Sequence, residues 1–316
     1  MKQFCSTIYH SILYFLETSY ALFYSLLFGR AISNKLVVLK MDGGVCSQMH
    51  FYLIGMLLQE KGYDVKFDLT WFRKNAKDCN GVFARNFDLL KMFPSLPFSE
   101  PSKSEMMKAK CHVITNDYFS NKTSDSFAYL NVKSPCYLQG YFRDPAGLYT
   151  VEFNKYFKVS FDVLDETNKK MLKDINDTNA IAIHVRRGDL ATYNSAYGDP
   201  CDVDYFQNAI NYVHDIAPET NKLFFFSDEP SWVVTTLLPK MKIRTNLPTC
   251  VVDINGSDRG YMDILLMSAC QYIISSNGSV GKFAYLLSQN AKMLICRNNS
   301  SSQNEMWRQL KNVKFI

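Results

Sequence analysis

The fold is indicated most clearly by residues 180–190, Ala180-Ile181-Ala182-Ile183-His184-Val185-Arg186-Arg187-Gly188-Asp189-Leu190. Its apolar, β-branched first half is typical of a buried strand in a parallel sheet. Arg186 and Arg187 follow where that strand ends. Ligands of open parallel sheets bind outside the carboxyl ends of the strands, and a guanidinium fork fits phosphate oxygens. Two adjacent cations there predict a pyrophosphate site; the alternative is a surface arginine pair bridged to local carboxylates.

Length and composition limit the possible classes of protein. A chain of 316 residues, 47% hydrophobic and 21% charged, has room for two folded domains. The net charge of +5 fits an anionic ligand or a membrane surface, but no Lys/Arg block of the nucleic-acid kind occurs, so no nucleic-acid partner is expected. The nine cysteines form no CxxC pair. They indicate neither a disulfide framework nor a zinc site, and they favour a reducing compartment.

Residues 11–29 are apolar and long enough to span a bilayer, but Glu17 lies near their middle. An acid there costs about 2.5 to 3.5 kcal/mol, against about 0.3 to 0.6 gained per Leu, Ile or Phe. Polar residues recur every seven positions, which predicts an amphipathic helix within residues 1–34. Three arrangements of this helix are open: it lies on a membrane surface, it packs on the protein, or it spans the bilayer. Of these, we expect peripheral association of the helix with a membrane. If the helix spans the bilayer, the positive residues after it, Arg30, Lys35 and Lys40, place the bulk of the chain on the cytoplasmic side. We therefore expect a cytoplasmic location at the inner face of the membrane.

The first strand and turn after this segment also suggest a ligand site. Residues 35–40 form a short apolar strand, and Gly43 and Gly44 follow before an apolar-periodic helix. Such a turn lets a backbone approach a sugar nucleotide at a helix N-terminus. A tight turn without a ligand is the alternative. Residues 71–135, broken by prolines, are predicted to be irregular and to contact an acceptor substrate.

The second half of the chain repeats strands and helices. Residues 205–214 are periodic as a helix, and residues 222–226 form a strand that ends in Ser227 and Asp228. This rhythm predicts a parallel sheet with helices on both faces. A further strand at 272–275 runs through a Ser/Asn/Gly turn into a helix, which would offer N–H groups and hydroxyls to a phosphate. Helix capping is the alternative role for these Ser and Asp residues.

Four motifs together resemble one known family. They are Gly43 to Met49 (GGVCSQM), His184 to Asp189 (HVRRGD), Phe226 to Glu229 (FSDE) and Ser276 to Tyr285 (SNGSVGKFAY). In order and spacing they resemble the α1,2-fucosyltransferases of glycosyltransferase family 11. Cys46-Ser47 and Lys282-Phe283 depart from the family pattern, which usually has Gly-Asn and Trp-Trp there. The tripeptide Arg187-Gly188-Asp189 also matches an adhesive motif, but it directly follows a core strand.

The resemblance implies an α/β fold of the GT-B type, with two Rossmann-like domains and parallel sheets. Residues 35–160 would be the acceptor-side domain and residues 161–316 the GDP-fucose-binding domain. The implied activity is the inverting transfer of L-fucose from GDP-fucose to a galactose O2 of a glycan acceptor, with no cofactor and no metal. A GDP-sugar or glycan binding protein without catalysis, and a transferase using another GDP-sugar, are the alternatives.

The resemblance also implies the site residues. Arg186 would stabilise the leaving diphosphate, and Arg187 would support either the diphosphate or the fold of the motif. Asp189 is a catalytic candidate, either as the general base or as the partner of Arg186, and Asp144 and Asp42 are the other candidates for the base. The expected donor-binding residues are Gly43, Gly44, Gln48, His184, Ser227, Asp228, Asp263, Asn277 and Ser279.

Overall fold

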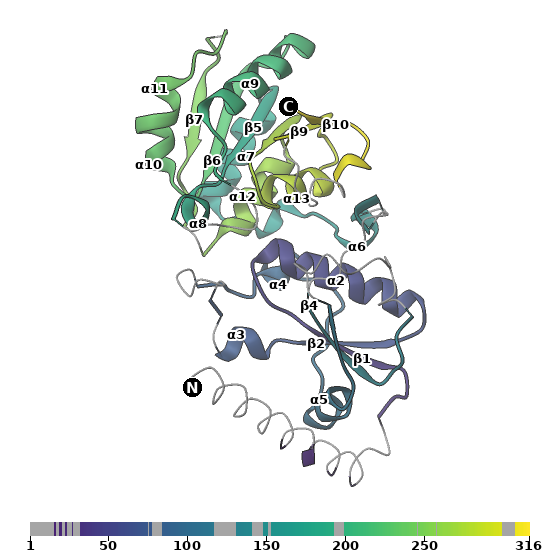
Figure 1. Ribbon diagram of the computed structural model, residues 1–316. Coiled ribbons are helices and arrows are strands. Elements are labelled where there is room, and N and C mark those ends of the chain that lie inside the picture. Colours follow the sequence, from purple (N-terminus) through teal and green to yellow (C-terminus); the bar gives the residue numbers. More distant parts are fainter. Residues whose placement is uncertain are drawn as a thin grey trace, which may run out of the picture. The chain divides into compact units, whose positions relative to one another are not determined.

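The computed structural model of the chain divides into two compact units (Figure 1). Unit 1 comprises residues 1–89 and 95–144, and unit 2 comprises residues 90–94 and 145–316. The structure describes Leu16, Ser19, Tyr20, Phe23, Leu27 and residues 32–74, 76–77, 84–116, 131–140, 148–150, 153–192, 199–244, 246–256, 258–298 and 307–316.

Unit 1 is built on a parallel sheet with the strand order β2-β1-β4-β3. The helix α2 lies on one face of this sheet and α5 lies on the other (Figure 1). The strands are β1 (Leu36–Lys40), β2 (Asp64–Asp68), β3 (Val113–Asn116) and β4 (Cys136–Gly140), and the helices are α2 (Val45–Glu60), α3 (Thr70–Lys74), α4 (Leu89–Met92, which ends in unit 2) and α5 (Lys103–Lys110).

Close packing of α2 on the sheet depends on a residue without a side chain. A Cβ at Gly55 would lie 2.6 Å from the ring of Phe67 on β2, so only glycine fits here without displacing the ring. The ring of Tyr52 stacks on the same Phe67 at 5.4 Å between centroids. On the opposite face, Ala109 of α5 packs with Leu36 and Val38 of β1. The segment predicted to be irregular, residues 71–135, thus contains α5 and β3, which complete the unit.

Unit 2 contains a larger parallel sheet with the strand order β10-β9-β8-β5-β6-β7. The strands are β5 (Ala180–Val185), β6 (Lys222–Ser227), β7 (Thr249–Val252), β8 (Tyr272–Ser275), β9 (Met293–Cys296) and β10 (Val313–Phe315). The chain moves outward from β5 through β6 to β7, and then from β8 through β9 to β10 on the other side. The strand order therefore reverses between β5 and β8, and this is where open parallel sheets bind ligands.

The alternation of side chains along β5 gives each face of the sheet its own partners. Ile181, Ile183 and Val185 pack against α9 in a core cluster. The opposite face of β5, with His184, lies against α13, where a Cβ at Gly281 would come within 3.2 Å of the Cβ of His184. The helices of unit 2 are η3 (Leu148–Thr150), α6 (Phe153–Tyr156), η4 (Phe161–Val163), α7 (Glu166–Asn176), α8 (Gly188–Thr192), α9 (Val203–Ile216), α10 (Pro230–Trp232), η5 (Val233–Leu237), α11 (Leu238–Lys240), α12 (Gly260–Ser268) and α13 (Val280–Leu287).

The boundary between the units lies at 144/145, whereas the sequence placed it at 160/161. The difference comes from aromatic contacts that the sequence pattern does not show. The ring centroids of Phe153 in α6 and Phe283 in α13 are 5.7 Å apart, and those of Phe157 and Phe93 are 5.2 Å apart. Residues 145–160 and the short piece 90–94 thereby belong to the core of unit 2.

The predicted class is confirmed: the protein is α/β, with parallel sheets in two units. Most of residues 11–29 lie outside the described residues, and Leu16, Ser19, Tyr20, Phe23 and Leu27 are helical. Within the part of the chain that the structure describes, no helix combines the length and apolar character needed to cross a membrane.

Candidate functional site

The strand ends at the switch point of unit 2 bring two of the four motifs together. Arg186 follows β5 directly, and the turn Ser276-Asn277-Gly278-Ser279 follows β8 and begins α13. His184 and Ser275 are register partners across the two strands. The backbone N–H of Ser276 donates to the carbonyl of His184 at 3.1 Å, so both segments leave the sheet side by side.

Arg186 is held against this turn. Its backbone N–H donates to Oγ of Ser276 at 2.9 Å. Gly278 has a φ of +99°, a left-handed conformation that favours glycine, and a Cβ there would lie 2.5 Å from Nη1 of Arg186. The guanidinium group therefore packs on the backbone of the turn, and any side chain at position 278 would displace it.

His184 contacts the Ser276 hydroxyl that binds the backbone of Arg186, and it is not suited to acid or base catalysis. Its Nδ1 lies 3.1 Å from Oγ of Ser276, the same hydroxyl that accepts from Arg186. The imidazole is buried, which together with the charges of Arg186 and Lys282 lowers the pKa of His184 to about 3. The ring is consequently neutral near pH 7 and orients the Ser276 hydroxyl.

Arg187 points to the other face of the sheet, as the alternation along the chain requires. Its guanidinium carbon lies 3.8 Å from the centroid of the Trp232 ring, and its Nε donates to Glu229 at 3.2 Å. Its backbone N–H donates to Oδ1 of Asp228 at 2.9 Å. The two adjacent arginines thus have different surroundings, and only Arg186 lies against the turn after β8.

Ser227 and Asp228, both predicted to bind the donor, fasten the arginine motif to the end of β6. Oγ of Ser227 donates to the carbonyl of Val185 at 2.8 Å and accepts from the backbone N–H of Glu229 at 3.0 Å. Since Oδ1 of Asp228 accepts from the backbone N–H of Arg187, both residues hold the motif against the end of β6. The side chain of Asp189 in α8 lies outside the described residues, as does Asp144.

The N-terminus of α13 offers hydrogen-bond donors beside Arg186. The helix has eight residues, and its N-cap residue, Ser279, makes no side-chain capping bond. Asn277 is 5% exposed and donates from Nδ2 to the carbonyl of Asp199 at 2.6 Å, which holds the turn in place. The first turn of α13 leaves backbone N–H groups available for an anion.

Lys282 is a further candidate site residue, which the sequence analysis did not predict. It lies in the first turns of α13, only 5% exposed, with Nζ 5.6 Å from the Trp307 ring centroid. Burial lowers its pKa, and the charge of Arg186 lowers it further. The available signal was its position, because a lysine at a place where the family usually has an aromatic pair introduces a charge into an apolar helix face.

Asp263 belongs to a part-buried polar network at the same edge of the sheet. Its Oδ1 accepts from Nδ2 of Asn255 at 2.8 Å, and Asn255 and Asn168 exchange a pair of hydrogen bonds at 2.8 and 3.0 Å. Burial raises the pKa of Asp263 to about 7, although Asn255 and Arg259 oppose that shift. Its carboxyl group therefore changes charge near neutral pH.

In unit 1, the predicted Gly43 and Gly44 lie in the turn between β1 and α2, and the predicted Gln48 lies in the first turn of α2. Gly43 has a φ of +75°, and Gly44 is the N-cap of α2 without a side-chain capping bond. Gln48 is fully buried and fully hydrogen-bonded. Its Nε2 donates to the carbonyls of Gly43 and Asn86 at 3.1 and 2.8 Å, and its Oε1 accepts from the N–H groups of Asp88 and Leu89 at 2.9 and 3.0 Å. Gln48 thus holds the glycine turn in place.

Asp42, a candidate for the general base, lies beside this turn. Its carboxylate pairs with Nζ of Lys40 at 3.0 Å. Both side chains are partly exposed, so the pair is accessible to solvent.

Comparison with known proteins defines the class of this one. The family model described as Glycosyl transferase family 11 matches residues 98–314, more than half of the chain, so the protein is a glycosyltransferase. It belongs to glycosyltransferase family 11. The match includes Arg186 and the turn after β8, whereas Gly43, Gly44 and Gln48 lie outside it.

One curated relative and several solved structures are similar to the chain. The O-antigen biosynthesis glycosyltransferase WbnK of Escherichia coli is 30% identical over 132 residues, and the match covers 39% of this chain and 40% of that protein. POFUT1 in complex with GDP matches with a TM-score of 0.41 and 10% identity, covering 90% of this chain and 99% of POFUT1. The ADP-heptose LPS heptosyltransferase II of E. coli matches with a TM-score of 0.44 and 11% identity, covering 89% of each chain.

Proposed function

We propose that the protein transfers L-fucose from GDP-fucose to a hydroxyl group of a glycan acceptor, the galactose O2, with inversion at the anomeric carbon. The observation that carries this proposal is the position of Arg186 at the switch point of unit 2, against the turn that begins α13. Membership of family 11 and the four fucosyltransferase-like motifs support the donor. Similarity to the O-antigen biosynthesis glycosyltransferase WbnK supports an acceptor of the O-antigen kind.

The chemical demand on the site is the stabilisation of a leaving diphosphate. The bond between the fucose C1 and the β-phosphate oxygen breaks, and its electron pair stays on that oxygen. Arg186 would donate N–H groups to the phosphate oxygens on which this charge develops. Preorganised donors of this kind are usually the largest catalytic contribution. The backbone hydrogen bond from Arg186 to Oγ of Ser276 and the packing of its guanidinium group on Gly278 hold Arg186 in place before the donor binds.

Two further groups of unit 2 would share the charge. The ammonium group of Lys282 is buried near Arg186, and a diphosphate would stabilise its charged form. The backbone N–H groups at the start of α13, together with the Ser279 hydroxyl, are suited to the second phosphate. With these cations in place, we propose that transfer needs neither a metal ion nor a cofactor.

The remaining roles are assigned by position. The polar network of Asp263, Asn255 and Asn168 lies at the same sheet edge as Arg186 and is suited to the nucleoside part of GDP. The acceptor oxygen attacks C1 from the face opposite the diphosphate, and its proton passes to a base. Asp189, Asp144 and Asp42 remain the candidates for that base, and the glycine turn of unit 1 remains a proposed donor contact.

A donor screen tests the proposal. The full-length protein is incubated with galactose-containing oligosaccharides and either GDP-fucose or GDP-mannose, with and without EDTA, and the product linkage is determined by methylation analysis. We expect an α1,2-linked fucose from GDP-fucose only, with the same rate in EDTA. Turnover with GDP-mannose alone would assign another donor. Binding of GDP without any transfer or hydrolysis of GDP-fucose would show a binding protein.

A further inference from the structure

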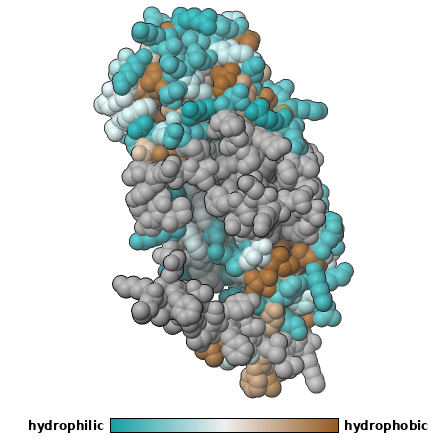
Figure 2. Space-filling view, in the orientation of Figure 1, coloured by the Kyte–Doolittle hydropathy of each residue, from teal (hydrophilic) through white to brown (hydrophobic). Residues whose placement is uncertain are grey.

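Unit 1 exposes an unusual stripe of apolar side chains near the start of the chain. Leu16, Tyr20, Phe23 and Leu27 are 57, 51, 62 and 58% exposed. Their spacing of four, three and four positions places them on one face of a helix. Among the described residues, the other large exposed apolar side chains are Ile216 and Val234, in separate elements of unit 2. The visible surface of unit 2 is mainly hydrophilic, with hydrophobic residues in small groups (Figure 2).

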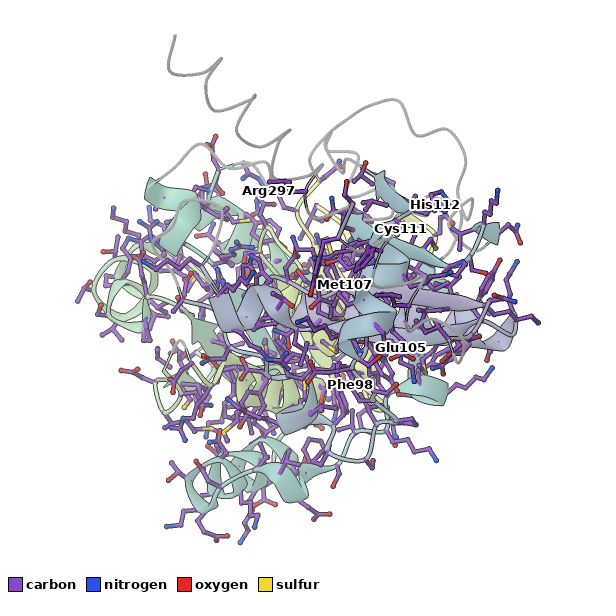
Figure 3. The ribbon with its side chains drawn as sticks, turned by 90° about the horizontal axis from the view of Figure 1, so that it is seen from below. Phe98, Glu105, Met107, Cys111, His112 and Arg297 are labelled. Carbon is purple, nitrogen blue, oxygen red and sulfur yellow. The ribbon has the colours of Figure 1, made fainter. Side chains whose placement is uncertain are left out.

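Tyr20 also connects the stripe to a cavity of about 330 Å³ in unit 1. The helix α5 forms one wall of this cavity with residues of a single face, namely Lys103, Met106, Met107 and Lys110. Figure 3 views α5 from below and labels Glu105 and Met107 along it. The two lysines are seven positions apart, so they stand about 10 Å from each other along the helix axis, with the methionines between them.

The charge around this surface is positive. The helix α5 carries Lys103, Lys108 and Lys110 against a single acid, Glu105. Glu105 is engaged in the capping box with Ser102. Two acids also line the cavity: the carboxylate of Glu100 is paired with Arg73, and that of Asp68 accepts from the hydroxyl of Tyr137 at 2.7 Å. Lys103 is exposed, and Lys110 lies 5.5 Å from the Tyr137 ring centroid.

We propose that the apolar stripe and the lysines of α5 together dock the protein on an anionic phospholipid surface. The four apolar side chains would enter the interface between headgroups and acyl chains, and Lys103 and Lys110 would contact the phosphates beside them. A second copy of the chain is the less favourable occupant, because it would bring the excess lysines of two α5 helices together. Docking of this kind is independent of the transfer reaction, so a test of vesicle binding does not depend on whether the proposed function is correct.

Vesicle co-sedimentation of the full-length protein tests the docking surface. The probes are vesicles of phosphatidylcholine alone and vesicles containing about one third phosphatidylglycerol. We expect binding to the anionic vesicles. The double variant Phe23→Glu/Leu27→Glu should bind at least about tenfold more weakly, because burial of two large apolar side chains is lost. The matched control, Ile216→Glu/Val234→Glu, changes exposed apolar residues of unit 2 and should bind like the wild type.

A second pair of variants tests the charge. Lys103→Gln/Lys110→Gln should weaken binding to anionic vesicles by about thirtyfold, since each lysine near such a surface contributes about 1 kcal/mol. The control Lys240→Gln/Lys242→Gln removes the same number of positive charges from unit 2 and should leave binding to the anionic vesicles unchanged. Circular dichroism and light scattering check the fold and the oligomeric state of each variant. Equal binding by wild type and stripe variant, or a wild-type dimer that the stripe variant abolishes without any vesicle binding, would overturn the proposal.

Discussion

Replacing Arg187 by alanine should destabilise unit 2 while leaving nucleotide binding nearly intact. The Nε of Arg187 lies 3.2 Å from Glu229, and these side chains are 22 and 37% exposed, so the ion pair contributes about 0.5 to 1 kcal/mol. The guanidinium carbon lies 3.8 Å from the Trp232 ring centroid, and a stacked cation of this kind contributes about 0.5 to 2 kcal/mol. The free energy of unfolding should therefore fall by about 1 to 3 kcal/mol.

Urea unfolding followed by tryptophan fluorescence measures this loss, and calorimetry measures the dissociation constant for GDP. Arg187→Ala should bind GDP within about threefold of the wild type, because its side chain lies on the face of β5 away from the turn after β8. The control is Arg244→Ala, whose pair with Asp215 is more than half exposed and should contribute less than about 1 kcal/mol. Unchanged stability with a tenfold loss of GDP affinity would refute this reasoning.

Four further substitutions test the site. Gly278→Ala should weaken GDP binding at least about tenfold by calorimetry, because the new Cβ meets Arg186 and the left-handed backbone disfavours it. Gln48→Leu should lower the urea-unfolding free energy by about 2 to 4 kcal/mol, because two buried N–H groups lose their acceptor. The pKa of His184 is lowered to about 3, so its stabilising contribution is present above pH 6.5 and is lost as the pH falls, by about 2 kcal/mol between pH 7.5 and 5. The pKa of Asp263 is raised to about 7, so its ionisation destabilises the fold at pH 7.5 and this cost eases by about 2 kcal/mol at pH 5. His184→Asn and Asp263→Asn should therefore change the pH dependence of unfolding in opposite directions, and parallel changes would contradict both assignments.

Much of the fold could be predicted because it follows from local patterns. The strands at 35–40, 180–183 and 222–226 are apolar runs of the length that a buried parallel strand needs, and the structure confirms them as β1, β5 and β6. The helix at 205–214 is periodic and appears as α9. The position of the boundary at 144/145 could not be predicted, because it depends on contacts between aromatic residues far apart in the chain, such as Phe153 and Phe283.

Part of the candidate site could also be predicted from local sequence, and part could not. Its location at the end of β5 follows from the strand pattern, and the structure brings Arg186 and the turn at Ser276 to one switch point. The separate surroundings of Arg186 and Arg187 depend on Trp232 of α10, which is 45 positions away in the sequence and contacts Arg187 in the folded unit. The burial of Lys282 is a tertiary property as well. Alternation along the strand and the unusual position of Lys282 are the local signals, but neither identifies the partner that each side chain meets in the folded unit.

The proposed role of Arg186 as the main contact of the diphosphate is measured by titrating GDP into the Arg186→Ala variant. Loss of charge-assisted hydrogen bonds to the phosphates should weaken GDP binding by at least about tenfold. The unfolding free energy should stay close to that of the wild type. Wild-type affinity for GDP in the folded Arg186→Ala variant would contradict the account.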